Sequence, residues 1–208
     1  MALILGVCAA FAANAETVTI AALGDSLTAG YGLAPQDGLV PQLEAWLIAR
    51  GEDVVLINAG VSGDTTAGGL SRLEWTLTPD VQALIVTLGG NDMLRGLPPA
   101  ESRANLDAIL KGATDRGLPV LLIAMAAPGN YGPDYKAEFD ATYPNLAEKY
   151  SALLFPNFFA PLMTDTQDPA KLQSMMQSDG IHPTAEAVKI IVQGLGPKVL
   201  ELIAEARK

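Results

Sequence analysis

The sequence has 208 residues, of which 23 are acidic and 13 are basic, so its formal net charge is −10. This length is enough for one domain with a sizeable core, and half of the residues are hydrophobic. The acidic balance argues against nucleic acid and anionic membrane surfaces as partners, because both require clustered Lys and Arg. We therefore expect a globular protein that acts on a small molecule.

Residues 1–15 have the pattern of a secretion signal. They carry no charged side chain, are apolar up to the small-x-small pattern Ala13-Asn14-Ala15, and are too short to span a bilayer. We expect cleavage before Glu16, which leaves a single domain over residues 16–208 in a bacterial periplasm. The alternative for this segment is a buried amino-terminal helix.

The only cysteine in the sequence, Cys8, lies in this amino-terminal segment. Val7 precedes it where a lipoprotein signal requires a small residue, so we expect no lipid anchor and no stable membrane anchor of another kind. A mature chain without cysteine forms no disulfide and performs no thiol chemistry.

Five short apolar runs are predicted to be buried strands, over residues 18–23, 53–57, 81–88, 120–125 and 153–155. Helical patterns follow them, over residues 39–50, 65–77, 98–116, 134–150 and 184–206. Strand and helix therefore alternate, which predicts a parallel sheet with right-handed crossovers and helices on both faces. The expected fold class is α/β, a three-layer α/β/α, flavodoxin-like arrangement with a five-stranded parallel sheet.

Two stretches depart from this regular pattern. Pro144 is expected to kink or split the helix over residues 134–150, because proline has no N–H to donate. Residues 157–178 are predicted to be irregular, with short helical pieces.

Polar turns follow the first three strands. They are Gly24-Asp25-Ser26 after the first, Asn58-Ala59-Gly60 after the second and Gly90-Asn91-Asp92 after the third. The carboxyl ends of parallel strands meet at one edge of the sheet, where ligands bind, so we expect Ser26, Gly60 and Asn91 to lie close together. A serine hydroxyl beside backbone N–H groups and an amide suits acyl transfer, because the hydroxyl attacks and the donors stabilise the oxyanion.

His182 is the only histidine in the sequence and the only candidate base for such a serine. It lies in Asp179-Gly180-Ile181-His182-Pro183, just before the last predicted helix. Asp179 is close enough along the chain to bind the far imidazole nitrogen and set its tautomer. These residues predict a catalytic triad of Ser26, His182 and Asp179, whereas the alternative for a lone histidine is a packed or surface side chain.

Other chemistries are less well supported by the sequence. The carboxylates of Asp25, Asp64 and Asp92 suit a hard cation, but they show no known ligand spacing. The phosphate-loop motif is absent, and Thr28 replaces the second glycine of the Gly-x-Ser-x-Gly elbow. We therefore expect no metal and no cofactor.

Four blocks taken together resemble the SGNH (GDSL) hydrolase family. They are Gly24-Asp25-Ser26-Leu27, Gly60, Gly90-Asn91-Asp92 and Asp179-x-x-His182. Longer strings are similar to the bacterial periplasmic thioesterase I / lysophospholipase L1 group, whose close relatives include arylesterases: Ser62-Gly63-Asp64-Thr65, Leu88-Gly89-Gly90-Asn91-Asp92-x-Leu94-Arg95-Gly96, Asn130-Tyr131-Gly132 and Tyr143-Pro144-x-Leu146.

This resemblance implies a flavodoxin-like fold without a cofactor. It implies Ser26 as the nucleophile, His182 as the base and Asp179 as the group that orients the base. It further implies an oxyanion hole formed by the Ser26 N–H, the Gly60 N–H and the Asn91 side chain.

The function expected from these features is that of a secreted, monomeric serine esterase that acts on acyl esters or thioesters, including aryl esters and lysophospholipids. The apolar residues Leu94, Leu97, Met125 and Leu162 favour acyl chains. Two alternatives stay open, a carbohydrate O-deacetylase of the same fold and a non-catalytic periplasmic binding module.

Overall fold

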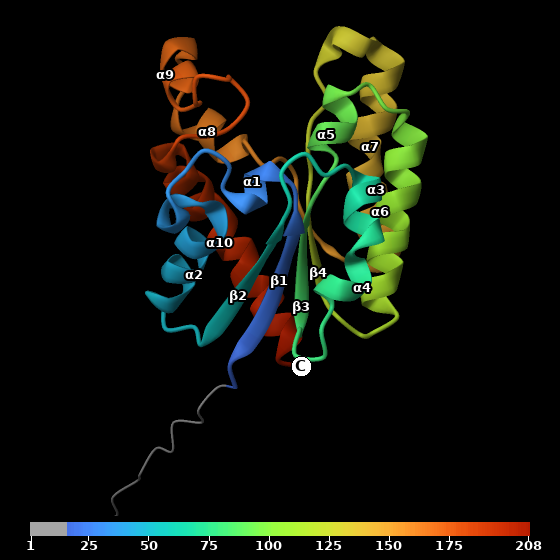
Figure 1. The fold of residues 1–208 in the computed structure, drawn as a ribbon, viewed down its shortest axis with the longest axis vertical. Helices are drawn as coiled ribbons and strands as arrows, with labels where there is room; N and C mark the ends of the chain where they lie inside the picture. Colours follow the sequence, from blue (N-terminus) through green and yellow to red (C-terminus); the bar gives the residue numbers. More distant parts are fainter. Residues whose placement is uncertain (1–15) are drawn as a thin grey trace, which may run out of the picture.

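A sheet of five parallel strands lies at the centre of the computed structural model, which describes residues 16–208 (Figure 1). The predicted secretion signal over residues 1–15 lies outside the described residues. The strands are β1 (Val18–Gly24), β2 (Val54–Gly60), β3 (Ala83–Thr87), β4 (Val120–Ile123) and β5 (Leu153–Phe155). Their order in the sheet, β2-β1-β3-β4-β5, is the flavodoxin-like order, so the predicted fold class is confirmed.

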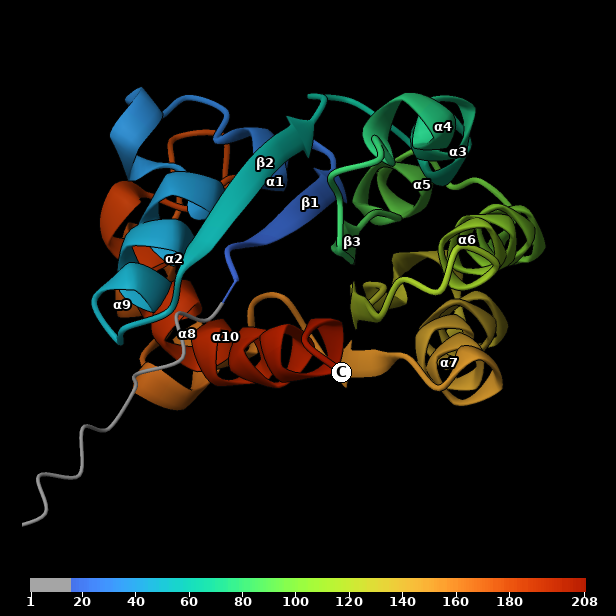
Figure 2. The same cartoon turned by 90° about the horizontal axis from the view of Figure 1, so that it is seen from below.

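Helices cover both faces of this sheet (Figures 1 and 2). Helices α2 and α10 pack together on one face, and α3, α4, α6 and α7 lie on the other. The helices are α1 (Ser26–Ala29), α2 (Leu39–Ile48), α3 (Thr66–Ser71), α4 (Leu73–Thr76), α5 (Gly90–Leu94), α6 (Pro99–Thr114), α7 (Pro133–Tyr150), α8 (Ala160–Asp165), α9 (Pro169–Ser174) and α10 (Ala185–Ala206), with short 3₁₀ turns η1 (Pro35–Asp37) and η2 (Gly129–Tyr131).

The strands form at runs of consecutive apolar residues, because layers of helices bury the side chains on both faces of the central strands. All residues of β3 and β4 are buried, whereas the edge strand β2 exposes Val55 and Ile57. Gly24 at the end of β1 pairs with Gly60 of β2 and with Thr87 of β3. The ends of these three strands therefore meet at one edge, as the sequence predicts.

Two helices differ from their predicted form. The single helix expected over residues 65–77 is two helices, because Arg72 between them has a non-helical backbone with φ −113° and ψ 9°. Pro144 does not split α7, which runs unbroken through it. The buried side chains of Phe139 and Tyr143 pack this helix against the core, and that packing outweighs the hydrogen bond that proline removes.

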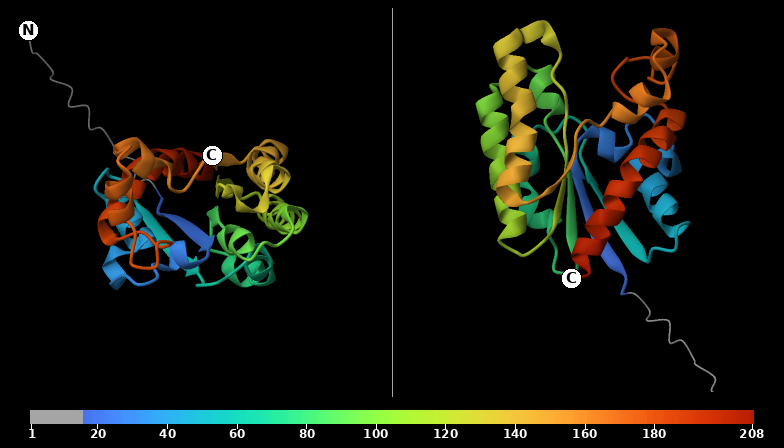
Figure 3. Two further views of the ribbon diagram at one scale, coloured as in Figure 1. Left: turned by 90° about the horizontal axis from the view of Figure 1, so that it is seen from above. Right: turned by 180° about the vertical axis from the view of Figure 1, so that it is seen from behind.

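The short helices α1, α5, α8 and α9 gather at the carboxyl end of the strands, and the C terminus of the chain lies at the opposite end (Figures 1 and 3). Helices α8 and α9 confirm the short helical pieces predicted within residues 157–178. None of the helices within residues 16–208 is long and apolar enough to cross a membrane.

Candidate active site

The turn after β1 presents Ser26 at the upper edge of the sheet. Asp25 caps the four-residue helix α1, and its Oδ1 accepts a hydrogen bond from the Leu27 N–H at 3.0 Å. Gly30 ends the helix in the left-handed conformation with φ 82°, which favours glycine. Ser26 is thus the first residue of a helix that starts directly from a buried strand, and it lines a cavity at this edge.

His182 reaches Ser26 from the loop between α9 and α10. The His182 Nε2 lies 2.8 Å from the Ser26 Oγ, although 156 positions separate the two residues in sequence. The loop is fixed by the Gln177 N–H, which donates to the His182 carbonyl at 2.7 Å, and by an isolated bridge between Met176 and Pro183. The structure therefore brings together the predicted nucleophile and the predicted base.

Asp179 lies on the far side of the same imidazole. Its Oδ2 is 2.6 Å from the His182 Nδ1, and its Oδ1 accepts the backbone N–H groups of Ile181 and His182 at 2.9 and 3.0 Å. Gly180, with φ 68°, allows the chain to turn back over the carboxylate. An Nδ1 proton held by Asp179 leaves Nε2 free to accept the proton of the serine hydroxyl.

These hydrogen bonds also set the charge of Asp179. The bond with the His182 ring, followed by the two backbone N–H groups, lowers the pKa of the carboxyl to about 2. Asp179 is therefore ionised throughout the neutral range, where it is an acceptor only and holds the imidazole in one orientation.

Asn91 is held at the start of α5 by a turn that requires glycine. Gly89 has φ 109°, and a Cβ there would lie 2.1 Å from the Tyr143 hydroxyl oxygen, so a side chain has no room. The Asn91 Nδ2 donates to the Asp64 carbonyl at 2.9 Å and to the Asp25 Oδ2 at a longer 3.3 Å. The amide lines the same cavity as the serine, as the sequence predicts.

Gly60 does not lie where the sequence predicts an oxyanion donor. Its N–H donates to the Asn58 Oδ1 at 3.0 Å, and a Cβ at this position would lie 2.3 Å from the Ala29 nitrogen. Glycine is required here because α1 packs directly on the end of β2, which is a structural role. Gly63 lines the cavity with Ser26 instead, and within residues 16–208 its N–H has no hydrogen-bond acceptor.

Two residues of this site, Gly63 and Tyr31, are not predicted by the sequence. Gly63 stands in Ser62-Gly63-Asp64-Thr65, in the loop that follows β2, whereas the position at the strand end that indicates a site residue belongs to Gly60. Tyr31 lies beside the base, with its ring centroid 4.5 Å from that of His182 and the ring planes tilted by 39°. A tyrosine five residues after a serine carries no signal of such a contact.

The cavity beside these residues has a volume of about 800 Å³ and a largely apolar wall. Leu94, Met125 and Leu162 line it as expected, whereas Leu97 does not. The other apolar side chains on the wall are Leu27, Tyr31, Met93, Phe159, Met163, Leu172, Met176 and Ile181. A cavity of this size and character can hold a hydrocarbon chain.

The acidic residues considered as metal ligands have other partners. Asp64 pairs with Arg72 at 2.6 Å, and Asp92 accepts hydrogen bonds from the Thr66 and Ser102 hydroxyl groups at 2.6 and 3.1 Å. No group of three or more His, Cys, Asp or Glu side chains in the described part of the chain is arranged to hold a metal ion.

Comparison with known proteins identifies the family. Residues 22–190 match the model of the GDSL-like Lipase/Acylhydrolase family. The chain belongs to this family. It is 37% identical to the esterase TesA of Pseudomonas aeruginosa over 191 residues, which cover 91% of this chain and 92% of that protein.

Two further relatives of the GDSL chain support the assignment. It is 34% identical to thioesterase 1/protease 1/lysophospholipase L1 of Escherichia coli over 194 residues, which cover 92% of this chain and 87% of that protein. The crystal structure of AlinE4, an SGNH-hydrolase family esterase, has a TM-score of 0.72 and 46% identity, covering 89% of this chain and 96% of that chain. The resemblance seen in the sequence is therefore confirmed.

The protein is a GDSL esterase, a serine hydrolase that acts on ester bonds. A non-catalytic binding module is not consistent with this assignment.

Proposed function

We propose that this GDSL esterase hydrolyses acyl esters and thioesters through a triad of Ser26, His182 and Asp179 and a covalent acyl-enzyme. The observation that carries the proposal is the continuous chain of contacts from the Ser26 Oγ to the His182 Nε2 at 2.8 Å and from the His182 Nδ1 to the Asp179 Oδ2 at 2.6 Å. Nucleophile, base and orienting acid at hydrogen-bond distances form the arrangement that activates a serine.

The reaction follows from these contacts in two steps. As the Ser26 Oγ attacks the acyl carbon, its proton passes to the His182 Nε2, which then protonates the departing alcohol or thiol. The C–O or C–S bond of the substrate breaks and a serine ester remains. Water deprotonated by the same nitrogen then attacks this ester, releases the acid and restores the hydroxyl.

Three donors surround the position where the oxyanion develops. We propose the Ser26 N–H at the first turn of α1, the Gly63 N–H in place of that of Gly60, and the Asn91 amide. One N–H of the Asn91 amide is held by the Asp64 carbonyl at 2.9 Å, whereas the second makes only a 3.3 Å contact with the Asp25 Oδ2, longer than a normal hydrogen bond of this type. This second N–H is the one that donates to the oxyanion.

The cavity indicates the class of substrate. Its wall is mainly Leu, Met, Phe and Ile side chains, and it opens beside Ser26, so it favours an ester with an aliphatic or aromatic acyl group. The names of the relatives, an esterase and a thioesterase with lysophospholipase activity, agree with this class. A sugar O-deacetylase requires polar groups that orient the sugar, and the apolar wall offers few of them.

We further propose that residues 1–15 direct export and are removed, so that residues 16–208 act as a single-domain monomer in the periplasm. The support for this proposal is the uncharged apolar segment and its small-x-small end.

The decisive experiment compares single alanine variants of the proposed triad. Ser26→Ala and His182→Ala should each lower kcat for p-nitrophenyl butyrate by roughly 10⁴-fold or more with an unchanged melting temperature. Their losses should not add in the double variant, because the two residues act as a unit. A fluorophosphonate probe should label the wild-type enzyme but not Ser26→Ala.

Ser71→Ala is the matched control, because this exposed hydroxyl only donates to the Gly68 carbonyl. It should be labelled and should turn over substrate like the wild-type enzyme. If Ser26→Ala retained turnover or labelling, another nucleophile would have to be sought.

A further inference from the structure

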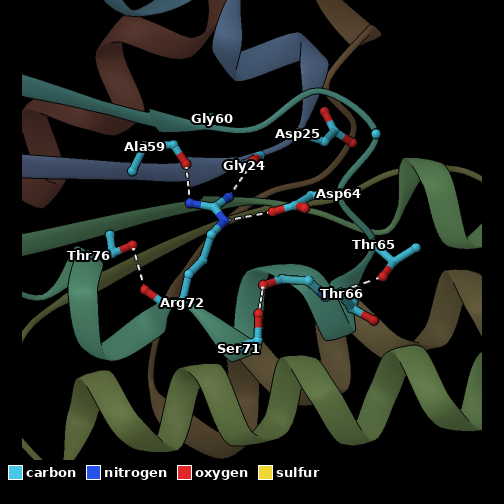
Figure 4. Close-up of polar contacts among 12 residues, drawn as sticks. Gly24, Asp25, Ala59, Gly60, Asp64, Thr65, Thr66, Ser71, Arg72 and Thr76 are labelled. Atoms are coloured by element: carbon cyan, nitrogen blue, oxygen red, sulfur yellow. Dashed lines mark hydrogen bonds and ion pairs between the residues drawn. The ribbon is translucent and has the colours of Figure 1, made fainter.

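Arg72 connects the ends of two strands to the loop that follows β2 (Figure 4). It stands in the break between α3 and α4, and its side chain extends to the sheet edge. The Nη1 donates to the Ala59 carbonyl at 2.6 Å, the Nη2 donates to the Gly24 carbonyl at 2.8 Å, and the Nε pairs with the Asp64 Oδ2 at 2.6 Å. One guanidinium therefore contacts β1, β2 and the loop at once.

Two of these three acceptors, the Gly24 carbonyl and Asp64, lie next to residues of the proposed site. The Gly24 carbonyl ends β1 just before Asp25 and Ser26, and it also accepts the Val61 N–H at 3.0 Å. Asp64 follows Gly63 directly, and its own carbonyl accepts the Asn91 amide at 2.9 Å. The contacts of Arg72 therefore fix the backbone on which the nucleophile and the oxyanion donors stand.

The guanidinium is suited to this role by its shape. It is planar and always charged, and its donors form a rigid fork, so three bonds in fixed directions define the relative positions of three acceptors. The Arg72 and Asp64 side chains are about one-fifth exposed, which limits competition from water. A lysine ammonium keeps the charge but cannot reach three separated acceptors with the same geometry.

We propose that Arg72 is a positioning residue of the oxyanion hole. Its guanidinium locks the loop over residues 61–64 against the ends of β1 and β2, so that the Gly63 N–H and the Asn91 amide point at the place where negative charge develops. Donors that are already oriented stabilise the transition state without reorganisation, and a small displacement of them is costly. The inference rests on the proposed function, because Arg72 acts through the donors named there.

If Arg72 only stabilised the fold, its replacement would lower the melting temperature without changing kcat. Arg116 is the control, because its contacts resemble those of Arg72 but lie away from the site. The Arg116 guanidinium also joins a carbonyl, that of Leu77 at 2.8 Å, to a carboxylate, that of Glu74. It does not line the cavity. Loss of a structural arginine lowers the melting temperature but leaves kcat of the folded enzyme unchanged.

The experiment measures kcat, KM and melting temperature for Arg72→Lys, Arg72→Gln and Arg116→Gln with p-nitrophenyl butyrate. Both Arg72 variants should lose roughly 10- to 100-fold in kcat. Their KM should stay within about threefold of the wild-type value, because the donors matter mostly in the transition state. Arg116→Gln should keep kcat within about twofold, even if its melting temperature falls.

A double-mutant cycle tests whether Arg72 acts through the oxyanion donors. Asn91→Ala alone should lower kcat by roughly 10²–10³-fold. In the Asn91→Ala variant, Arg72→Gln should lower kcat by a smaller factor than it does in the wild-type enzyme, because part of its effect passes through the missing amide. Additive losses, or an Arg72→Lys enzyme with wild-type kcat, would overturn the inference.

The activities of Ser26→Ala and Arg72→Gln together separate the role of Arg72 from that of the triad. A Ser26→Ala variant with wild-type turnover contradicts both, since no oxyanion would then form at this serine. An inactive Ser26→Ala together with a fully active Arg72→Gln contradicts the role of Arg72 alone.

Discussion

Asp25 is a buried carboxyl directly beside the proposed nucleophile. Only 2% of its surface is exposed, and burial raises the pKa of this carboxyl to about 6. Hydrogen bonds from the Leu27 N–H and the Asn91 amide, and the nearby His182, lower the pKa by less than burial raises it. The ionised carboxylate caps α1 and contacts the Asn91 amide, and so it orders the site. Its burial in the charged form lowers the free energy of unfolding.

This pKa predicts how stability depends on pH. The folded value of about 6 lies above the unfolded value near 3.9, so the folded protein binds this proton more tightly. The ionised form destabilises the fold above pH 6, and this cost, on the order of 3 kcal/mol, is relieved as the pH falls from 6 toward 4. Asp25→Asn should therefore flatten the rise in stability between pH 7.5 and pH 4.5, as measured by urea unfolding.

Asp179 serves as the contrast in the same measurement. Its pKa of about 2 lies below the unfolded value, so its contribution to stability is present above pH 4 and is lost only as the pH falls toward 2. The ionisation of the Asp179 carboxyl itself therefore contributes nothing to the slope between pH 7.5 and pH 4.5. Equal slopes for the wild-type protein and Asp25→Asn would show that Asp25 is not the titrating group.

At the scale of elements, α8 and α9 form one side of the cavity. Six-residue helices have little stability of their own, and here contacts hold them. The Asp168 side chain caps α9 through the Ala170 N–H, and Lys171 pairs with Asp165 at 2.9 Å. Because α9 is anchored in this way, Leu172 is presented to the cavity as a defined wall.

This wall predicts the acyl-chain preference. Leu172→Trp should fill part of the cavity and lower the ratio of kcat/KM for decanoyl over butyryl p-nitrophenyl esters by about 10-fold or more. Ala170→Trp is the matched control, because this position is exposed on the same helix and does not line the cavity. An unchanged ratio in Leu172→Trp would place the acyl chain elsewhere.

At the scale of the whole molecule, the site occupies one end and the start of β1 lies at the other (Figure 1). A segment that precedes β1 therefore joins the fold far from the cavity, and its removal should not disturb the site. We predict that exported protein begins at Glu16 and has the same kcat as a chain expressed from Glu16. Amino-terminal sequencing of the exported protein checks this, and recovery of Met1 would contradict it.

The sequence alone was sufficient for the features that depend on periodicity or on near neighbours. Alternating apolar strands and amphipathic helices predict a parallel α/β sheet, because each pattern reports burial of its own element. Asp179 and His182 were predictable as a pair because they lie only three positions apart in one turn, which keeps their side chains close. Ser26 and Asn91 were predictable because strand ends of a parallel sheet share an edge.

Contacts between segments that are distant in the sequence decide the roles of Gly60, Gly63 and Arg72. The sequence predicts Gly60 as an oxyanion donor, and only the packing of α1 on β2 and the bond of its N–H to Asn58 show that Gly60 has a structural role, while Gly63 lines the cavity. Arg72 falls within the single helix predicted over residues 65–77, yet its guanidinium binds backbone carbonyl groups 13 and 48 positions away at the sheet edge. Such roles have no local signature, because the acceptors are backbone atoms that every residue type supplies and only the folded chain brings together.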